Sequence, residues 1–159
     1  MKKDLITRLN EGPVLCAEGY LFAMERRGYL QAGAFVPEVV LEHPEVLSQL
    51  HREFIRSGSD VIQAFTYYGH REKLRIIGKE QLLEPLQKNA LQIAKDSREE
   101  FKDLDLMVCG DVANTNIYDP KDKKSNIECQ KMFEEQVAWA KEAGVDFIVA
   151  ETITWVEEM

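Results

Sequence analysis

The chain has 159 residues, of which 45% are hydrophobic and 30% are charged, and its formal net charge is -8. This composition is typical of one globular domain with an apolar core and excludes a disordered or fibrous chain. Acidic residues outnumber basic ones 28 to 20 without a dense lysine and arginine run, so we expect no nucleic acid or membrane partner. No apolar run approaches the ~18 residues of a membrane span and no signal peptide follows Met1, which predicts a cytoplasmic protein.

The three cysteines, Cys16, Cys109 and Cys129, are widely spaced and form no C-x-x-C motif. An odd number at such spacing is neither a disulfide framework nor a self-contained zinc site. Each lies in an apolar run or on the apolar face of a predicted helix. We therefore expect three buried structural thiols.

Four short apolar runs predict buried strands. Near-continuous apolar strands of this kind favour a parallel sheet that is covered on both faces. The runs are residues 14–17, 61–65, 106–110 and 147–150.

Between these runs, apolar residues recur every three or four positions, which predicts helices. Pro85 is compatible only with a place near the start of its helix. Ser125 and Glu128 have the S-x-x-E spacing of a capping box, which predicts the start of the last helix. The helical patterns cover residues 46–55, 82–94 and 125–140.

Two helix-to-strand junctions, residues 57–64 and 143–150, nearly repeat each other. In each, a glycine ends the helix and an aspartate follows two residues later, ahead of an apolar strand. Glycine supplies the left-handed helix cap and aspartate the polar turn. Phe65 and Glu151 then fall at the carboxyl ends of strands, where α/β proteins place ligand-contacting groups.

The strand starts at 14, 61, 106 and 147 are separated by 47, 45 and 41 residues. An eight-unit (β/α)8 TIM barrel at this pitch needs roughly 350 residues. We therefore expect residues 1–159 to be the N-terminal part of such a barrel, covering about its first four βα units. The last residues, 156–159, read as the opening turn of the fourth helix. No glycine-rich nucleotide-binding motif occurs.

Polar groups that follow the predicted strands are the candidate site residues. Glu151 ends an apolar strand, and its burial would require a partner or a ligand, unless it caps the next helix. Glu18 follows the first strand, and Gly19 would permit close approach of a ligand to the backbone. The other candidates are Thr66, Tyr67, Tyr68, Asp111, Asn114, Thr115 and Thr152.

The remaining candidates have simpler alternatives. Tyr67 and Tyr68 could form an aromatic wall for a methylated ammonium or sulfonium group, or could pack in the core. Asp111 and the residues after it fall in a predicted polar loop, where Asp and Asn are ordinary turn formers. None of the three histidines is placed to serve a nucleophile, so we expect structural or surface roles. They are His43, His51 and His70.

Several strings of residues closely resemble betaine–homocysteine S-methyltransferases, of the homocysteine S-methyltransferase family. The resemblance is densest over residues 10–75, is loose through the third unit and returns at residues 145–158. It is carried by Glu18-Gly19-Tyr20-Leu21-Phe22-Ala23-Met24-Glu25-Arg26-Arg27-Gly28-Tyr29, Glu42-His43-Pro44-Glu45, Leu50-His51-Arg52-Glu53-Phe54 and Gln63-Ala64-Phe65-Thr66-Tyr67-Tyr68. It implies a (β/α)8 barrel that transfers a methyl group from betaine, or a related donor, to the sulfur of homocysteine.

The resemblance also implies roles for individual residues. Glu151 falls at a strand-four glutamate that contacts substrate, and Tyr68 matches a donor-site tyrosine. Phe35 occupies the place of a donor-site tryptophan. The family's first-strand Gly-Asp-Gly-Gly is here residues 16–19, Cys-Ala-Glu-Gly, which moves the carboxylate by one position to Glu18.

Three further departures concern the donor and the metal. Ala64 stands where the family usually has a hydroxyl residue, and Thr152 where the betaine enzyme has a tyrosine, which weakens the expectation of betaine as donor. The family binds zinc through three cysteines on later strands. We therefore expect no metal ligand in this chain and zinc ligands beyond residue 159.

Two hypotheses follow for the chain itself. In the first, it is the N-terminal half of a zinc-dependent homocysteine S-methyltransferase and is inactive alone. In the second, it is a non-catalytic half-barrel that binds a small ligand or regulates an enzyme, and associates with itself or a partner to cover its strand edges.

Overall fold

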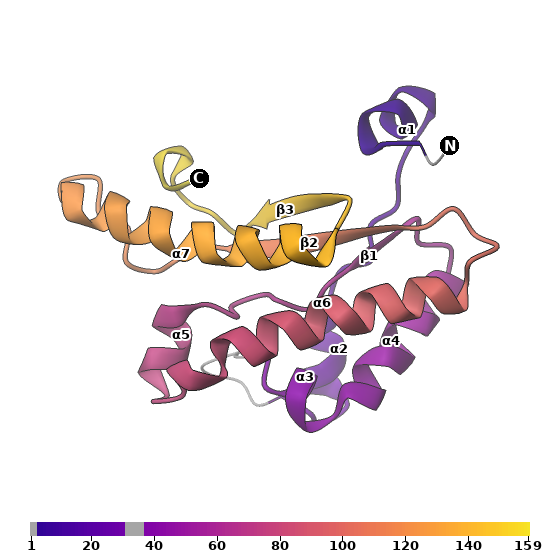
Figure 1. The fold of residues 1–159 in the computed structure, drawn as a ribbon, viewed down its shortest axis with the longest axis horizontal. Coiled ribbons are helices and arrows are strands. Elements are labelled where there is room, and N and C mark those ends of the chain that lie inside the picture. Colours follow the sequence, from indigo (N-terminus) through magenta and orange to yellow (C-terminus); the bar gives the residue numbers. More distant parts are fainter. Residues whose placement is uncertain (1–2, 31–36) are drawn as a thin grey trace.

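The computed structural model describes residues 3–30 and 37–159. Three parallel strands form one sheet in the order β1-β2-β3, and helices lie between the strands along the chain (Figure 1). The elements are α1 (Leu5–Glu11), α2 (Tyr20–Arg26), α3 (Val39–Glu42), α4 (Pro44–Arg56), β1 (Val61–Gln63), α5 (Arg71–Ile76), η1 (Glu80–Leu82), α6 (Leu83–Glu100), β2 (Met107–Ala113), α7 (Lys123–Ala143), β3 (Phe147–Glu151) and η2 (Val156–Glu158).

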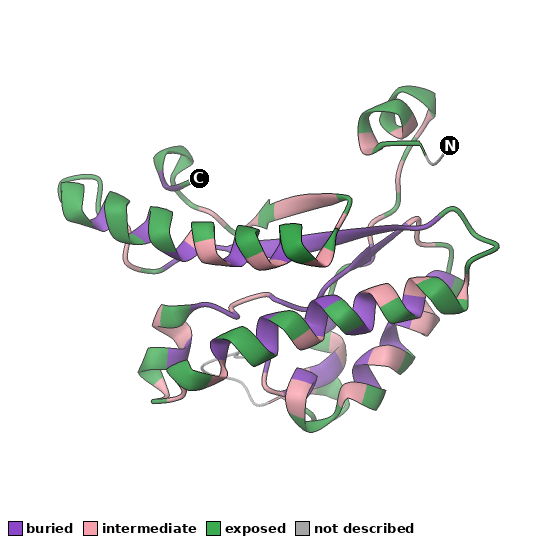
Figure 2. Cartoon of the chain, in the orientation of Figure 1, coloured by how far each residue is buried: buried purple, intermediate pink, exposed green. Residues whose placement is uncertain are grey.

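The predicted α/β alternation is confirmed for the three later strands. Ile62 pairs with Val108, and Gly110 pairs with Ile148, both in parallel register. Parallel neighbours require a long crossover, and α6 and α7 supply it. β2 is buried along its whole length, whereas β3 is only partly covered (Figure 2).

The predicted first strand, residues 14–17, is reduced to a single bridge between Cys16 and Val61. The segment still runs beside β1, because the Ala17 N–H donates to the Val61 carbonyl at 2.9 Å. Pro13 has no N–H to extend the pairing at one end. At the other end, Gly19 takes a left-handed φ of 81° and begins α2.

Helices α4, α6 and α7 pack against one face of the sheet. Ile62, Val108 and Ile148 point from that face into a core that includes Leu91 of α6 and Ala140 of α7. A Cβ on Gly110 would lie 3.2 Å from the Ala140 Cβ, so α7 lies directly on β2. This face is covered by helices, and the opposite face of the sheet carries the side chains described below.

The three predicted helices are confirmed as α4, α6 and α7, while α1, α2, α3 and α5 escaped prediction. Pro85 is the third residue of α6, as its chemistry requires. The predicted capping box is wrong, because α7 begins before Ser125. Asp122 is the N-cap and accepts from the Lys124 N–H at 2.9 Å, whereas the Ser125 hydroxyl donates to the Asp122 carbonyl at 2.7 Å.

The two similar junctions adopt the same structure. Gly58 and Gly144 have φ of 100° and 73°, in the left-handed region. Asp60 accepts from the Leu15 N–H at 2.8 Å, and Asp146 accepts from the Val108 N–H at 2.7 Å. Each aspartate therefore ties the start of its strand to the neighbouring segment of the sheet, a role beyond the predicted turn.

The final residues form η2, a single turn of 3-10 helix, where an opening helical turn was predicted. Glu158 is buried and accepts from the Thr115 N–H at 2.7 Å and from the Thr115 hydroxyl at 2.6 Å. No helix in the described ranges has the length and apolar character needed to cross a membrane.

Candidate functional site

The face of the sheet opposite α6 and α7, called the inner face below, is apolar at the amino ends of the strands and polar at their carboxyl ends. Alternate residues of a strand share a face, so Gln63, Asp111 and Glu151 lie on the same side as the apolar residues that precede them. Those apolar residues, Val61, Met107, Cys109, Phe147 and Val149, pack together at the amino end. The polar side chains are therefore gathered at the carboxyl ends of the three strands.

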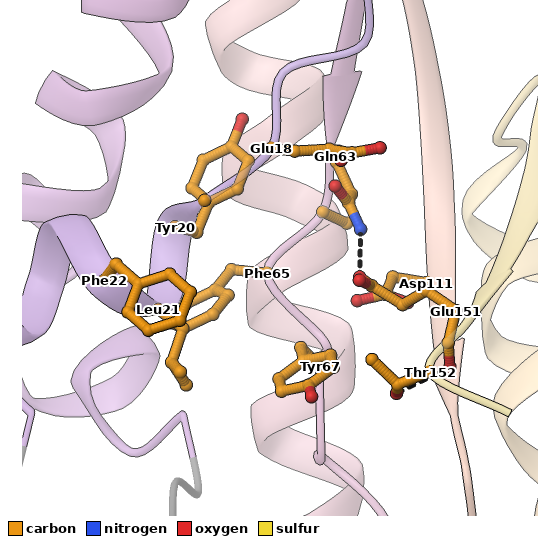
Figure 3. Close-up of a pocket in the computed structure, with 12 residues that line it drawn as sticks. Glu18, Tyr20, Leu21, Phe22, Gln63, Phe65, Tyr67, Asp111, Glu151 and Thr152 are labelled. Atoms are coloured by element: carbon orange, nitrogen blue, oxygen red, sulfur yellow. Dashed lines mark hydrogen bonds between the residues drawn. The ribbon is translucent and has the colours of Figure 1, made fainter. Parts of the chain in front are cut away.

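A cavity of about 400 Å³ lies at this end of the sheet. Its wall combines the start of α2 with the ends of β1, β2 and β3 (Figure 3). The lining residues are Glu18, Gly19, Tyr20, Leu21, Phe22, Gln63, Ala64, Phe65, Tyr67, Asp111, Glu151 and Thr152. The structure thus brings together six of the predicted candidates. They are Glu18, Gly19, Tyr67, Asp111, Glu151 and Thr152.

Glu151 is held by Gln63, a residue outside the predicted site. Gln63 is 4% exposed, and its side-chain amide donates to Glu151 Oε1 at 2.8 Å. The bond joins β1 to β3 across β2 and fixes one carboxylate oxygen (Figure 3). Glu151 itself is half-buried and lines the cavity.

Asp111 belongs to β2 and not to a loop, because the strand continues to Ala113. The predicted loop position was therefore wrong. The residue is 2% exposed, and neither carboxylate oxygen makes a hydrogen bond of ordinary geometry with the described residues, although the Glu151 carboxyl and the Gln63 amide lie beside it. Burial, and after it the negative charge of Glu151, raise the pKa of Asp111 well above its ordinary value.

Thr66 does not line the cavity but fixes Asp111 in place. Its hydroxyl donates to the Asp111 carbonyl at 2.7 Å, and its oxygen accepts from the Asp111 N–H at 3.2 Å. Thr66 is 2% exposed. The predicted site residue Thr66 therefore lies behind the cavity lining and holds the backbone of β2 in place at Asp111.

Aromatic rings form the wall opposite the carboxylates. Tyr20 and Phe65 stack with their ring centroids 5.9 Å apart, and Phe22 stands at the same side of the cavity (Figure 3). Partial burial raises the pKa of Tyr67 to about 12, so its phenol remains neutral at physiological pH. An anionic rim facing aromatic rings is suited to a cationic ligand.

Tyr68, the predicted donor-site residue, is not among the lining residues that the structure describes. Its ring lies 4.2 Å from that of Tyr67, centroid to centroid, and the Lys73 ammonium sits 3.9 Å from its centroid. Tyr68 therefore contacts a cation of the chain itself and supports Tyr67 from behind. Phe35, the other predicted donor-site residue, lies outside the described residues.

Two residues beside the cavity have strained backbones. Tyr68 and Thr152 have φ of 55° and 56°. The left-handed region is unfavourable for a β-branched side chain such as that of Thr152. Strain of this kind persists where the surrounding structure enforces it, and it concentrates at functional sites.

The cysteines do not form a metal site. Across the described ranges, no group of three or more His, Cys, Asp or Glu side chains could hold a metal ion. Cys129 lies apart from the other two and contacts the Thr115 hydroxyl at 3.1 Å. The residues present therefore do not fit the zinc site that the resemblance implies.

Two of the cysteines lie close together on the inner face. A hydrogen bond between Cys109 and Cys16 lowers the pKa of Cys16 and raises that of Cys109. Cys109 and Cys129 are buried, as expected, whereas Cys16 is only half-buried because its segment lies at the edge of the sheet.

The comparisons with known proteins agree with this geometry. The model of the family described as homocysteine S-methyltransferase matches residues 19–159. Betaine–homocysteine S-methyltransferase 1 of Mus musculus is 40% identical over 162 residues, which cover 99% of this chain and 39% of the mouse protein. The Sus scrofa protein of the same name is also 40% identical, over 99% of this chain and 56% of that protein.

A solved structure shares the fold. The homocysteine methyltransferase MmuM from Escherichia coli, in its metallated form, superposes with a TM-score of 0.79 at 21% identity. The match covers 97% of this chain and 59% of that one. The chain thus spans between 39% and 59% of the length of these relatives. It belongs to the homocysteine S-methyltransferase family.

Proposed function

We propose that the chain supplies the amino-acid and methyl-donor side of a site that transfers a methyl group to the sulfur of homocysteine. The observation that supports this most directly is the cavity itself. Carboxylates from β2 and β3 face the aromatic wall formed by Tyr20, Phe65 and Tyr67. The homocysteine amino group is cationic, and methyl donors of the betaine type carry a quaternary ammonium, so both substrates offer positive charge to this cavity.

The chain would act by positioning. Holding a nucleophile and a methyl group in line converts a bimolecular step into an effectively unimolecular one. Glu151, fixed by Gln63, would orient the amino acid. The neutral phenol of Tyr67 and the Phe65 ring would hold the donor by their faces.

We further propose that residues 1–159 form the first four βα units of a (β/α)8 barrel. The partly covered β3 lies at the edge of the described sheet. If residues 14–17 are counted as the first strand, β3 is the fourth, and a fifth strand would pair with its free edge. Because the described residues offer no three-ligand group, any zinc in the complete protein would take its ligands from beyond residue 159. The chain alone should then bind substrate without catalysing transfer.

Calorimetric titration of L-homocysteine into the purified chain tests this proposal. We expect saturable binding that Glu151→Gln weakens by about tenfold or more, since a charge-assisted hydrogen bond is lost. Glu157→Gln, the same change at an exposed glutamate, should bind like the unmodified chain. Absence of homocysteine binding by the folded chain would overturn the proposal. Methyl transfer by the chain alone would contradict the part of the proposal that places the zinc ligands beyond residue 159.

A further inference from the structure

Asp111 is a buried carboxylate whose position the fold itself does not require. Its backbone bonds to Thr66 would form with any side chain at this position. The side chain nevertheless lines the cavity, and neither oxygen makes a hydrogen bond of ordinary geometry among the described residues, although the Glu151 carboxyl and the Gln63 amide lie beside it. A buried carboxylate without hydrogen bonds is strongly destabilising. The side chain must therefore be relieved either by a proton or by a ligand.

No basic side chain is available to relieve it. The described residues that line the cavity include no Lys, Arg or His. The titratable groups around Asp111 are instead Glu151, Cys16 and Cys109, together with Glu18 and Tyr67 of the cavity lining. All of these are neutral or negative, so an ionised Asp111 adds to uncompensated negative charge. Burial and the negative charge of Glu151 raise the pKa of Asp111 well above its ordinary value, which favours the protonated carboxyl in the empty cavity.

The unpartnered oxygens identify the kind of cation. Both Asp111 oxygens need hydrogen-bond donors, and Gln63 already occupies Oε1 of the neighbouring Glu151 (Figure 3). A primary ammonium has three N–H donors and a positive charge. A quaternary ammonium or a sulfonium has no N–H, so it would neutralise the charge but leave these oxygens unbonded, and the aromatic faces suit it better.

We propose that Asp111 is a substrate-binding residue which, together with Glu151, holds the primary ammonium group of the amino-acid substrate and releases a proton to solvent on binding. The free carboxylic acid loses its proton to water as the ammonium enters, so one positive charge leaves the site for each that arrives. The identity of the amino acid rests on the proposed function, whereas the ammonium site does not.

The experiment is calorimetric titration of the full 159-residue chain in two buffers of different ionisation enthalpy, which counts the protons released. The probes are L-homocysteine, N-acetyl-L-homocysteine, in which the amine is no longer cationic, and methylammonium with tetramethylammonium as its counterpart. Asp111→Asn is compared with Asp103→Asn, the same change at an exposed aspartate. Thermal unfolding of each variant is followed in the absence of ligand.

We expect the unmodified chain to release up to one proton per homocysteine and to prefer methylammonium over tetramethylammonium. Asp111→Asn should bind homocysteine about tenfold or more weakly and release no proton, because one charge-assisted partner is gone. Its melting temperature should be unchanged or higher, since a destabilising buried carboxyl is removed. Asp103→Asn should behave like the unmodified chain.

The outcomes separate this inference from the proposed function. Homocysteine binding that is equal in the unmodified chain and Asp111→Asn overturns the inference and leaves the function standing. A lower melting temperature in Asp111→Asn would assign the side chain a structural role and also overturn it. Binding of methylammonium at Asp111 without binding of homocysteine supports the inference and contradicts the function. If no probe binds, both are wrong.

Discussion

Thr66 and Asp111 are joined by two hydrogen bonds through a single hydroxyl group. The Thr66 Oγ1 donates to the Asp111 carbonyl at 2.7 Å and accepts from the Asp111 N–H at 3.2 Å. The loop after β1 is thereby fastened to β2 at the level of the cavity. This contact makes Thr66 a positioning residue for Asp111.

Replacing Thr66 by valine should destabilise the chain and weaken ligand binding. The change keeps the shape of the side chain but leaves a buried N–H and a buried carbonyl without their partner, at a cost of roughly 1–3 kcal/mol. Urea unfolding measures the loss. Thr66→Ser, which keeps the hydroxyl, should lose less, and equal losses in the two variants would show that the hydroxyl is not the cause.

Acid should destabilise the fold through His51. Its ring is fully buried, with Nδ1 2.9 Å from the Tyr20 hydroxyl, and burial lowers the pKa of His51 to about 3 from an ordinary 6.5. Between these values the unfolded chain binds the extra proton, so the free energy of unfolding falls as pH falls from 6.5 towards 3. The slope is about 1.4 kcal/mol per pH unit for this group.

The test for His51 is urea unfolding at several pH values between 7 and 4. His51→Gln should reduce the slope, whereas His43→Gln, a change at an exposed histidine, should leave it intact. Burial also lowers the pKa of His70, to about 4, so part of the acid sensitivity should survive in His51→Gln. A slope that His51→Gln does not change would refute the assignment.

Substitution of Gly144 should lower the free energy of unfolding because of its backbone conformation alone. Its φ is 73°, and nothing lies within 4 Å of where a Cβ would be, so no steric clash is involved. Gly144→Ala should cost about 1–2 kcal/mol of unfolding free energy from left-handed strain. Gly144→Asn should cost less, because asparagine tolerates this region. Gly12→Ala, at an extended backbone with equally open space, is the control and should be close to neutral.

Local patterns predicted most of the fold. Apolar periodicity located α4, α6, α7 and the three paired strands, because each buries one face in the common core. The short helices carry too few turns to show a period. The segment at residues 14–17 is as apolar as a strand, but its pairing depends on Pro13 and on the turn at Gly19.

The site was predicted less completely than the fold. Glu18, Gly19 and Glu151 were found by their position after strands, and they do line the cavity. Gln63 and Asp111 were missed or misplaced because both lie inside strands. The alternation of faces could have found them, since Met107, Cys109 and Asp111 occupy one side of β2. Tyr67 lines the cavity and Tyr68 does not. This difference depends on the left-handed backbone at Tyr68, which the sequence does not specify.

The most direct test of the central claim is a crystal structure of the chain with L-homocysteine at saturating concentration. The account predicts density for the ligand in the cavity at the carboxyl ends of β1, β2 and β3. Its amino group should lie within hydrogen-bond distance of Glu151 and Asp111. Density for the ligand at another surface, or a cavity holding only water at saturation, would contradict the account.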